Sequence, residues 1–444
     1  MENHFLSLLY TLLVSITLLE CQQHHLLPDG GQIWALLVAG SSGYINYRHQ
    51  ADVCHAYQIL HRNGIPDSNI IVMMHDDIAF SKDNPTQGII INKPNGPNVY
   101  PGVLKDYTGK DVNVKNFLNV LSGNKTAMQG IGSGRVIDSG PNDHIFLNFV
   151  DHGSIGMLLF EDEELLASDF INAIEKMDAD KRFKKMVVYI EACYSGSMFD
   201  NLLPDDLNIF VTTATDPHES SYAMYYDNKR NTYLGDVFSE MWMDDSEDEN
   251  LAVESLNHQF QRVRTLTNTS HVEEYGDLDI GTTKLKEVIG FNPESLKSRK
   301  SDRTKIDAVP QDHVAVALLT KALAWTDSPE EAKEIHGKLQ QLFKKREEMN
   351  KMIRNILEKS IANVKHLYKV LASRPSLTKR NIQCYEDLVK HLSSRCFSIA
   401  QNPYATTLVG KFSNLCNLPS FNSTIAKLAM NEVCSNNIIL KGVL

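Results

Sequence analysis

The sequence predicts an α/β protein with a mostly parallel sheet, followed by a small helical domain. Three observations support this. Short apolar, β-rich stretches alternate with helical patterns over residues 33–213, a continuous helical pattern begins at residue 328, and four cysteines cluster in the last 61 residues, from 384 to 444. Because strands that alternate with helices pair in parallel and are covered on both faces, the first part is expected to be a helix-covered sheet.

The predicted strands are short and apolar, and each ends in a turn or loop. A helical pattern over residues 51–63, closed by Asn63 and Gly64, follows the first strand, and another covers 167–177. Residues 80–110 are rich in Pro, Gly and Asn and are expected to form a long loop. Residues 130–140 form a second exposed loop. The strands are expected at residues 33–40, 70–74, 143–150, 186–190 and 209–213.

The first residues have the features of a secretory signal. The chain has 444 residues, 42% of them hydrophobic, and residues 5–19 form an apolar run that is too short to span a membrane. We expect a signal peptide over 1–21, cleaved near Cys21. No other segment is long and apolar enough for a membrane anchor. Secretory entry agrees with three glycosylation sequons, at Asn124, Asn268 and Asn422.

The remaining chain is expected to form two domains joined by a linker. Around residues 290–312 the composition shifts to Pro, Ser, Lys, Arg and Asp, which is typical of a flexible or cleavable segment. Ser328 is a suitable N-cap and Pro329 fits the first helical turn. The predicted divisions are an α/β domain over 30–290, a linker over 291–327 and a helical domain over 328–444.

The four C-terminal cysteines indicate disulfides. Clustered cysteines in an exported chain usually pair, and four cysteines allow three pairings. A zinc site is the alternative, but the spacings contain no C-x-x-C element. The four residues are Cys384, Cys396, Cys416 and Cys434.

Two predicted strands run directly into reactive side chains. His152 follows the strand at 143–150, Cys193 follows the strand at 186–190, and small residues come after both. The carboxyl ends of neighbouring parallel strands share one crevice, so the two side chains are expected to meet. A thiol is a nucleophile as its thiolate, and histidine manages the proton near neutral or mildly acid pH. Alone, Cys193 would be interpreted as a buried thiol, but the matched pair predicts a Cys/His dyad.

The chain resembles the legumain (asparaginyl endopeptidase) family of cysteine peptidases, which are relatives of the caspases. The resemblance covers nearly the whole chain after about residue 30 and implies a full-length proenzyme. It implies a caspase-like sheet, a C-terminal prodomain and the pairings Cys384–Cys416 and Cys396–Cys434. The shared segments are WALLVAGSSGYINYRHQAD at 34–52, DHG at 151–153, EACYSGS at 191–197, ESSY at 219–222, YLGD at 233–236 and the four-cysteine tail.

The resemblance and the dyad together predict the chemistry. Cys193 attacks a peptide carbonyl, and His152 gives the proton with which the amine leaves. The backbone N–H groups of Gly153 and Cys193 are expected to bind the oxyanion. Asn46 matches the family position that orients the histidine. Asp151 matches a position linked to peptide-ligase chemistry, so a ligase side activity is expected as well.

The family's primary specificity pocket maps onto Arg48, Glu191 and Asp236, with His49 and Ser220 at its wall. One cation and two anions suit a carboxamide, since Arg48 can donate to its oxygen and the carboxylates accept from its nitrogen. Cleavage after Asn is therefore expected. An Asp side chain would add a third carboxylate, so cleavage after Asp should need acid pH.

The charge of the two parts differs in sign. Residues 1–330 carry 26 Lys and Arg against 47 Asp and Glu, net −21, and residues 331–444 carry 18 against 8, net +10. This difference suggests that the basic C-terminal domain docks over the acidic one and inhibits it until acidification and cleavage. The resemblance to legumain-type zymogens implies the same arrangement. The cleavage site is expected near Asn292 or Asp327.

Further expectations concern partners and location. We expect protein and peptide substrates, cystatin-type inhibitors, no nucleic acid, no membrane anchor, no metal and no cofactor. A lysosomal, endosomal or acidic digestive compartment is expected. Two rival functions remain open here. A glycolipid-anchor transamidase would need a C-terminal membrane segment, which residues 435–444 do not provide. A non-catalytic binding protein on the same fold would need the nucleophile or the histidine replaced.

Overall fold

The computed structural model describes residues 27–293, 307–419, 421–435 and 440–444. The predicted signal peptide with Cys21, and residues 294–306 of the predicted linker, lie outside the described residues.

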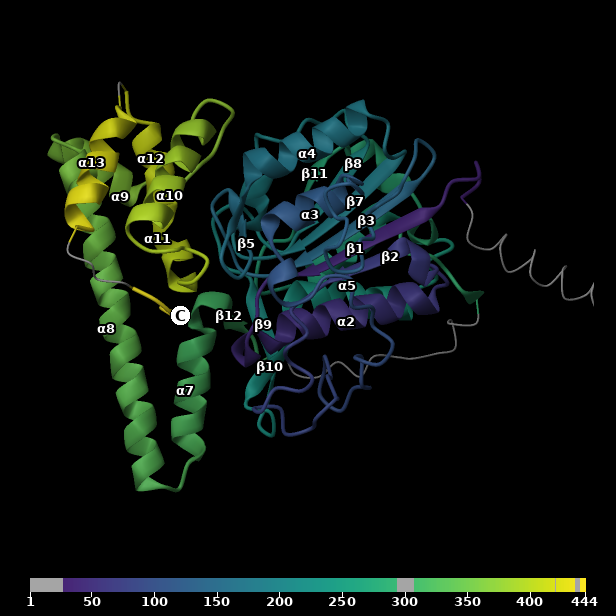
Figure 1. The fold of residues 1–444 in the computed structure, drawn as a ribbon, viewed down its shortest axis with the longest axis horizontal. Helices are drawn as coiled ribbons and strands as arrows, with labels where there is room; N and C mark the ends of the chain where they lie inside the picture. Colours follow the sequence, from purple (N-terminus) through teal and green to yellow (C-terminus); the bar gives the residue numbers. More distant parts are fainter. Residues whose placement is uncertain (1–26, 294–306, 420, 436–439) are drawn as a thin grey trace, which may run out of the picture.

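A six-stranded sheet forms the centre of the larger domain, and Figure 1 shows helices on both of its faces. The strand order is β11-β8-β7-β3-β1-β2, parallel except for β11, which pairs antiparallel with β8. Every strand predicted from the sequence is part of it, so the α/β prediction is confirmed. The bounds are β1 Ile33–Ala39, β2 Ile70–Met73, β3 His144–Val150, β7 Lys185–Glu191, β8 Ile209–Thr213 and β11 Glu273–Gly276.

The two faces of the sheet belong to separate apolar cores. Alternate residues of each strand point to opposite faces, so Leu36 and Val38 join one core while Ala35 and Leu37 join the other. The first core packs on α3 and α4, and the second on α2 and α5 (Figure 1) and on α6. These helices are α2 Tyr47–Arg62, α3 Val114–Leu121, α4 Ala167–Ala179, α5 Val237–Asp248 and α6 Leu256–Leu266.

Helix α2 starts four residues before the predicted helix, which was expected from residue 51. Its first turn contains Arg48, His49 and Gln50, which are polar but buried. A hydrophobic pattern does not detect such a turn, since its side chains are held by hydrogen bonds and ion pairs rather than by apolar contacts.

Two small antiparallel sheets stand beside the main one. In one of them, β9 (Tyr222–Asp227) and β10 (Thr232–Asp236) form a hairpin, and β12 (Val309–Pro310) is the third strand, paired with β9. The other sheet contains β4 Gly153–Ser154, β5 Met157–Leu159 and β6 Glu164–Leu166.

The described part of the linker is regularly folded, in contrast to the flexible segment expected at 290–312. After β12, a single 3-10 turn at Gln311–His313 leads into α7, Val314–Trp325. Helix α7 was not predicted. It packs along α8, Pro329–Ser360, and the two project from the body as a hairpin (Figure 1). Its apolar, partly β-branched sequence becomes helical because α8 provides a surface to pack on.

The C-terminal domain is helical, as predicted. The Ser328 hydroxyl accepts from the Glu331 N–H at 3.2 Å and caps α8, with Pro329 in the first turn. Its further helices include α9 Val364–Ala372, α10 Ile382–Arg395, α11 Thr406–Val409, α12 Lys411–Cys416 and α13 Ser423–Val433. None of the helices in the described ranges is long and apolar enough to cross a membrane.

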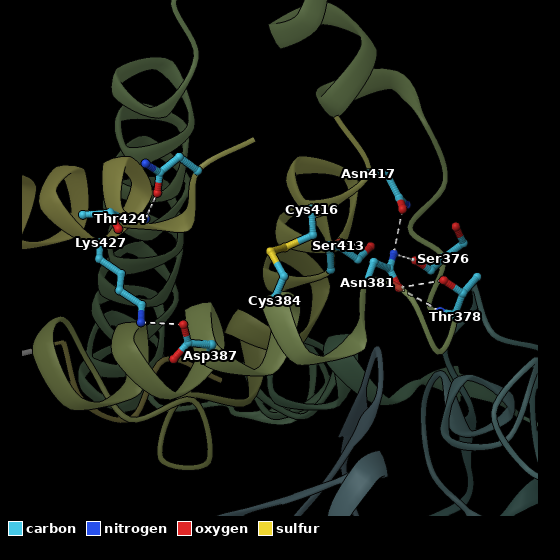
Figure 2. Close-up of a disulfide and its surroundings, with 12 residues drawn as sticks. Ser376, Thr378, Asn381, Cys384, Asp387, Ser413, Cys416, Asn417, Thr424 and Lys427 are labelled. Carbon is cyan, nitrogen blue, oxygen red and sulfur yellow. Dashed lines mark hydrogen bonds and ion pairs between the residues drawn. A yellow bond between two sulfur atoms is a disulfide. The ribbon is translucent and has the colours of Figure 1, made fainter. Parts of the chain in front are cut away.

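Two disulfides join these helices. Cys384 of α10 is bonded to Cys416 of α12, and Cys396 to Cys434, which is the pairing that the family resemblance implies. Figure 2 shows the first bridge beside the hydrogen bond from Asn381 to Asn417. The four sulfurs are bonded in two pairs and none is left to hold a metal, so the alternative of a zinc site is wrong.

The two domains meet mainly through hydrogen bonds and apolar contacts. Tyr385 Oη donates to the carbonyl of Ile155 at 2.7 Å, and Ser154 Oγ donates to the carbonyl of Thr406 at 2.6 Å. Within the described ranges, an ion pair across this boundary joins Lys390 to Asp169 at 4.0 Å. The opposite net charges of the two domains therefore attract each other at long range more than through direct ion pairs.

Candidate active site

The register of the sheet places the histidine and the cysteine together. Strands β3 and β7 are neighbours, and Val150 is paired with Glu191. His152 and Cys193 each come two residues later, at the same edge of the sheet. Both line one small cavity. The sequence prediction that two strand ends share a crevice agrees with this geometry.

Gly153 allows the two strand ends to approach closely. A Cβ atom at this position would collide with the carbonyl oxygen of Cys193 and lie 3.0 Å from the Ala192 Cβ. Only a residue without a side chain fits here unless the backbone moves. The glycine after the histidine is therefore a steric requirement for the arrangement.

Both reactive groups are in their uncharged forms in this state. Burial raises the pKa of Cys193 to about 11, although contacts with Ser220 (3.2 Å from Sγ to Oγ) and Ser221 (3.8 Å) lower it. Burial and the nearby Arg48 lower the pKa of His152 to about 3. His152 Nε2 lies 3.0 Å from Asn46 Oδ1, so the predicted orienting contact is present. The resting pair is a thiol and a neutral imidazole.

A carboxamide occupies the predicted pocket, and it belongs to the chain itself. The guanidinium of Arg48 donates from Nε to Asp236 Oδ1 at 2.9 Å and from Nη2 to Gln311 Oε1. Gln311 Nε2 donates to Asp236 Oδ1 at 3.0 Å, and its Oε1 lies 3.4 Å from His49 Nε2. Three predicted pocket residues thus surround one amide group, the oxygen facing the cation and the nitrogen facing the carboxylate.

The other two predicted pocket residues lie differently. Glu191 Oε2 accepts from the N–H and hydroxyl of Ser239, at 2.9 and 3.2 Å, rather than from Gln311. Burial and the nearby Asp236 raise the pKa of Glu191 to about 8. Ser220 contacts Cys193 and Asp312 instead of the amide.

Sequence reasoning missed Gln311 and its neighbours. The Gln311 N–H donates to the carbonyl of Ser221 at 3.0 Å, directly after β12 joins β9, so the linker enters the site as an added strand. The same cavity is lined by Asp312 and, from the C-terminal domain, by Thr406 and Leu444. Two-residue strands leave no periodic signal, and a linker glutamine has no feature that marks it in sequence.

Asp151 is fully buried beside the histidine. Its Oδ1 accepts from the His152 N–H at 2.5 Å and lies 3.6 Å from His49 Nδ1. Burial raises its pKa well above the usual value. His49, Asp151 and His152 have ligand atoms close enough together for a metal, as do Asp216, Glu219 and His271 at the surface, but cysteine-based peptide cleavage needs none.

A parallel α/β sheet whose adjacent strand ends bring a cysteine and a histidine to one cavity is the arrangement of a cysteine peptidase. Residues 33–291 match the model of the peptidase C13 family, and residues 337–434 match that of the legumain prodomain. The chain belongs to the peptidase C13, or legumain, family: it is a cysteine endopeptidase that carries a prodomain.

The sequence similarity to known members of the family extends over most of this chain. Legumain of Bos taurus is 46% identical over 414 residues, covering 91% of this chain and 94% of that protein. Legumain of Homo sapiens is 46% identical over 409 residues, with the same coverage. Hemoglobinase of Schistosoma japonicum is 37% identical, covering 93% and 96%. A solved caspase-1 from Spodoptera frugiperda is 12% identical, with a TM-score of 0.32 over 59% of this chain and 91% of that chain.

Proposed function

We propose that this enzyme hydrolyses peptide bonds after asparagine, and that its C-terminal domain and linker keep it inactive until acidification and cleavage. The observation that carries the proposal is the Gln311 carboxamide, which Arg48 and Asp236 hold beside Cys193 and His152. A pocket that satisfies both ends of an amide is suited to the side chain of asparagine.

The proposed reaction has two steps. Cys193 Sγ bonds to the substrate carbonyl carbon, its proton passes to His152, and His152 gives a proton to the amine as the C–N bond breaks. Water then attacks the thioester and restores the thiol. The N–H groups of Gly153 and Cys193 stabilise the oxyanion in both steps. Asn46 holds the imidazole ring in place.

The pocket is proposed to distinguish three similar side chains. Asparagine matches the amide contacts and the distance to Sγ. Glutamine makes the same contacts but is one methylene longer, so its scissile carbonyl is displaced, and a displacement near 1 Å costs about 100-fold in rate. Aspartate places a charge beside Asp236 unless it is protonated.

Matched peptides with Asn, Gln or Asp before the scissile bond test this proposal at pH 5 and pH 7. Cleavage after Asn should exceed cleavage after Gln by about 100-fold, and the Gln peptide should compete for the site while being cut only slowly. Cleavage after Asp should rise as the pH falls below about 5, because the substrate carboxylate then gains its proton. Equal cleavage after Asn and Gln would contradict the proposed specificity.

The proposed division of the chain follows from these contacts. Residues 30–290 form the catalytic domain, 291–327 the linker and 328–444 the inhibitory prodomain. Support comes from Pro403, Thr406 and Leu444, which line the cavity opposite the dyad. A substrate reaches Cys193 only after these residues and Gln311 leave.

His152 provides a reason for release at acid pH. Its pKa is about 3 in the closed state, and exposure would return it toward its ordinary value of 6.5. As the pH falls through 6.5, the open state gains a proton that the closed state cannot bind, so closure weakens. Glu386 has the opposite effect. Burial raises its pKa at the domain boundary, where it accepts from Ser168, so protonation favours closure there.

Hydrogen exchange can test this role of His152. In a full-length Cys193→Ala variant, which cannot cut itself, the protection of the amides at 311–313, corrected for the pH dependence of intrinsic exchange, should decrease below about pH 6. Adding His152→Asn should remove most of that loss of protection, since the amide does not titrate. An unchanged pH response in the double variant would assign the release to other groups.

Further features of the proposal rest on exposed residues. Asn124, Asn268 and Asn422 are all exposed and are proposed glycosylation sites. Asp327, exposed between α7 and α8, is the favoured site of activating cleavage over the half-buried Asn292.

Peptide ligation near Asp151, inhibition by cystatin-type proteins and entry through a signal peptide remain part of the proposal.

An acidic endolysosomal or digestive compartment is the proposed location. A relative from Vicia sativa named vacuolar-processing enzyme is 39% identical, covering 91% of this chain and 86% of that protein. Family membership also disfavours the two rival functions, the glycolipid-anchor transamidase and the non-catalytic binding protein.

A further inference from the structure

Four buried carboxyl groups lie beneath the specificity pocket. Asp52, Glu191, Asp236 and Glu240 are each at most 1% exposed. Arg48 forms an ion pair with Asp236, and Lys93 acts electrostatically on Glu240. Four buried negative charges beside two cations would cost several kcal/mol per unpaired ion, so this group must hold protons.

Asp52 is placed to share one of these protons with the pocket. It lies one helical turn after Arg48 on α2, and its Oδ1 accepts from Asn92 Nδ2 at 2.7 Å. Asn92 is itself fixed, because it also donates to the carbonyl of Leu234 at 3.0 Å and its Oδ1 lies 2.8 Å from His55 Nδ1. The Oδ1 atom of Asp52 thus has a hydrogen-bond donor that is itself held in place.

The second oxygen faces another carboxylate. Asp52 Oδ2 and Asp236 Oδ2 are both buried, and neither accepts from an N–H or hydroxyl donor in the described part of the chain. His49 Nε2 lies 3.8 Å from Asp236 Oδ2. A hydrogen bond with Asp52 lowers the pKa of Asp236, so the two carboxyl groups lie within reach of each other. Two carboxylate oxygens can be joined in this way only if a proton lies between them.

We propose that Asp52, in its protonated form, is a positioning residue that holds the Asp236 carboxylate toward Arg48 and the substrate carboxamide. This inference rests on the proposed function of the pocket and adds a determinant of its specificity. Asp236 Oδ1 receives Arg48 Nε and, in the closed state, Gln311 Nε2. A bond from Asp52 to Oδ2 prevents the carboxylate from rotating away from those partners.

The surroundings keep the proton on Asp52. Burial raises the pKa of Asp52 well above its ordinary value, and the facing carboxyls of Asp236 on β10, Glu240 on α5 and Glu191 on β7 act in the same direction. The Asn92 amide opposes them. On α2 itself, the cation of Arg48 is engaged by Asp236. Losing this proton at higher pH would set two carboxylates against each other directly below the substrate.

Two substitutions separate positioning from packing. Asp52→Asn has the same shape, and its amide can accept from Asn92 through the oxygen and donate to Asp236 through the nitrogen. Asp52→Leu has a similar volume and no hydrogen bond. The assay uses the full-length chain after acid activation, with Asn and Gln peptides between pH 4.5 and 7.5, and the rate at which iodoacetamide alkylates Cys193 reports on the dyad.

Asp52→Leu should raise the KM for the Asn peptide about 10- to 100-fold, with a smaller change in kcat, because a buried acceptor loses its partner. The alkylation rate should stay near the wild-type value. Asp52→Asn should stay within about threefold of the wild type at pH 5.

An unchanged KM in Asp52→Leu, or a KM in Asp52→Asn that rises by more than about tenfold at pH 5, would overturn the inference. The second comparison stands even if Asp52→Leu fails to fold. A wild-type enzyme that cuts equally after Asn and Gln refutes the proposed function instead, so the two failures are distinct.

Discussion

Replacing Cys193 with alanine should reduce kcat/KM for an Asn peptide by about 10⁴-fold or more, since no other group at the site replaces a lost nucleophile. The same substitution should stop any activating cleavage that the enzyme performs on its own linker. Folding should be little affected, because the side chain is small and its recorded contacts are with Ser220 and Ser221. Peptide turnover by purified protein, before and after acid treatment, measures both effects.

Cys54 provides the matched control. It is the second free cysteine in the described ranges, buried in α2 and 3.9 Å from the Met74 sulfur, away from the cavity. Burial raises the pKa of Cys54 to about 12, and Cys54 does not share the cavity with His152, so it has no partner there to take its proton. Cys54→Ala should keep most of the activity. Full activity in Cys193→Ala, or its loss in Cys54→Ala alone, would refute the assignment of the nucleophile.

Replacing Gln311 with asparagine should convert the inhibitory segment into a substrate. The shorter side chain keeps the amide contacts with Arg48 and Asp236 but draws the carbonyl carbon of residue 311 toward Cys193. Cleavage between residues 311 and 312 at pH 5 should become about 100-fold faster than in the wild type. Mass spectrometry of the fragments identifies the new terminus.

Gln311→Ala is the companion variant, because it removes the amide without creating a cleavage site. It should not be cut after residue 311, and it should hydrolyse the Asn peptide at pH 7 more readily than the uncleaved wild type. The reason is that closure loses the contacts of the Gln311 amide with Arg48 and Asp236, so a larger fraction of the uncleaved protein is open. An uncut Gln311→Asn protein together with an inactive Gln311→Ala protein would show that the side chain does not determine inhibition.

Five of the six strands of the central sheet could be predicted from the sequence, because they are largely buried and mostly apolar, whereas β11 (EEYG) is only half-buried and was not predicted. All seven residues of β3, for example, are buried. Helix α7 and the start of α2 could not be predicted. Helix α7 depends on α8, which lies beyond Asp327 in the chain, and the first turn of α2 is held by polar contacts with β10 and the linker.

The dyad was predictable for a related reason. His152 and Cys193 follow strands that are easily recognised, and the parallel register sets their meeting point. The pocket required the family resemblance, since Arg48 and Asp236 are 188 residues apart and an isolated charged residue carries no pattern. Gln311 and Asp52 were beyond both approaches. Their roles arise from partners that only the folded chain brings into contact.

The pairing of β12 with β9 bears on the tendency of the uncleaved protein to aggregate. A strand edge with unpaired N–H and C=O groups tends to associate with edges of other molecules. Val309 and Pro310 cover the edge of β9 at Tyr222 and Ala223, and Pro310 contributes no N–H for a further strand. The segment that we propose blocks the enzyme is therefore also expected to reduce aggregation of the concentrated protein.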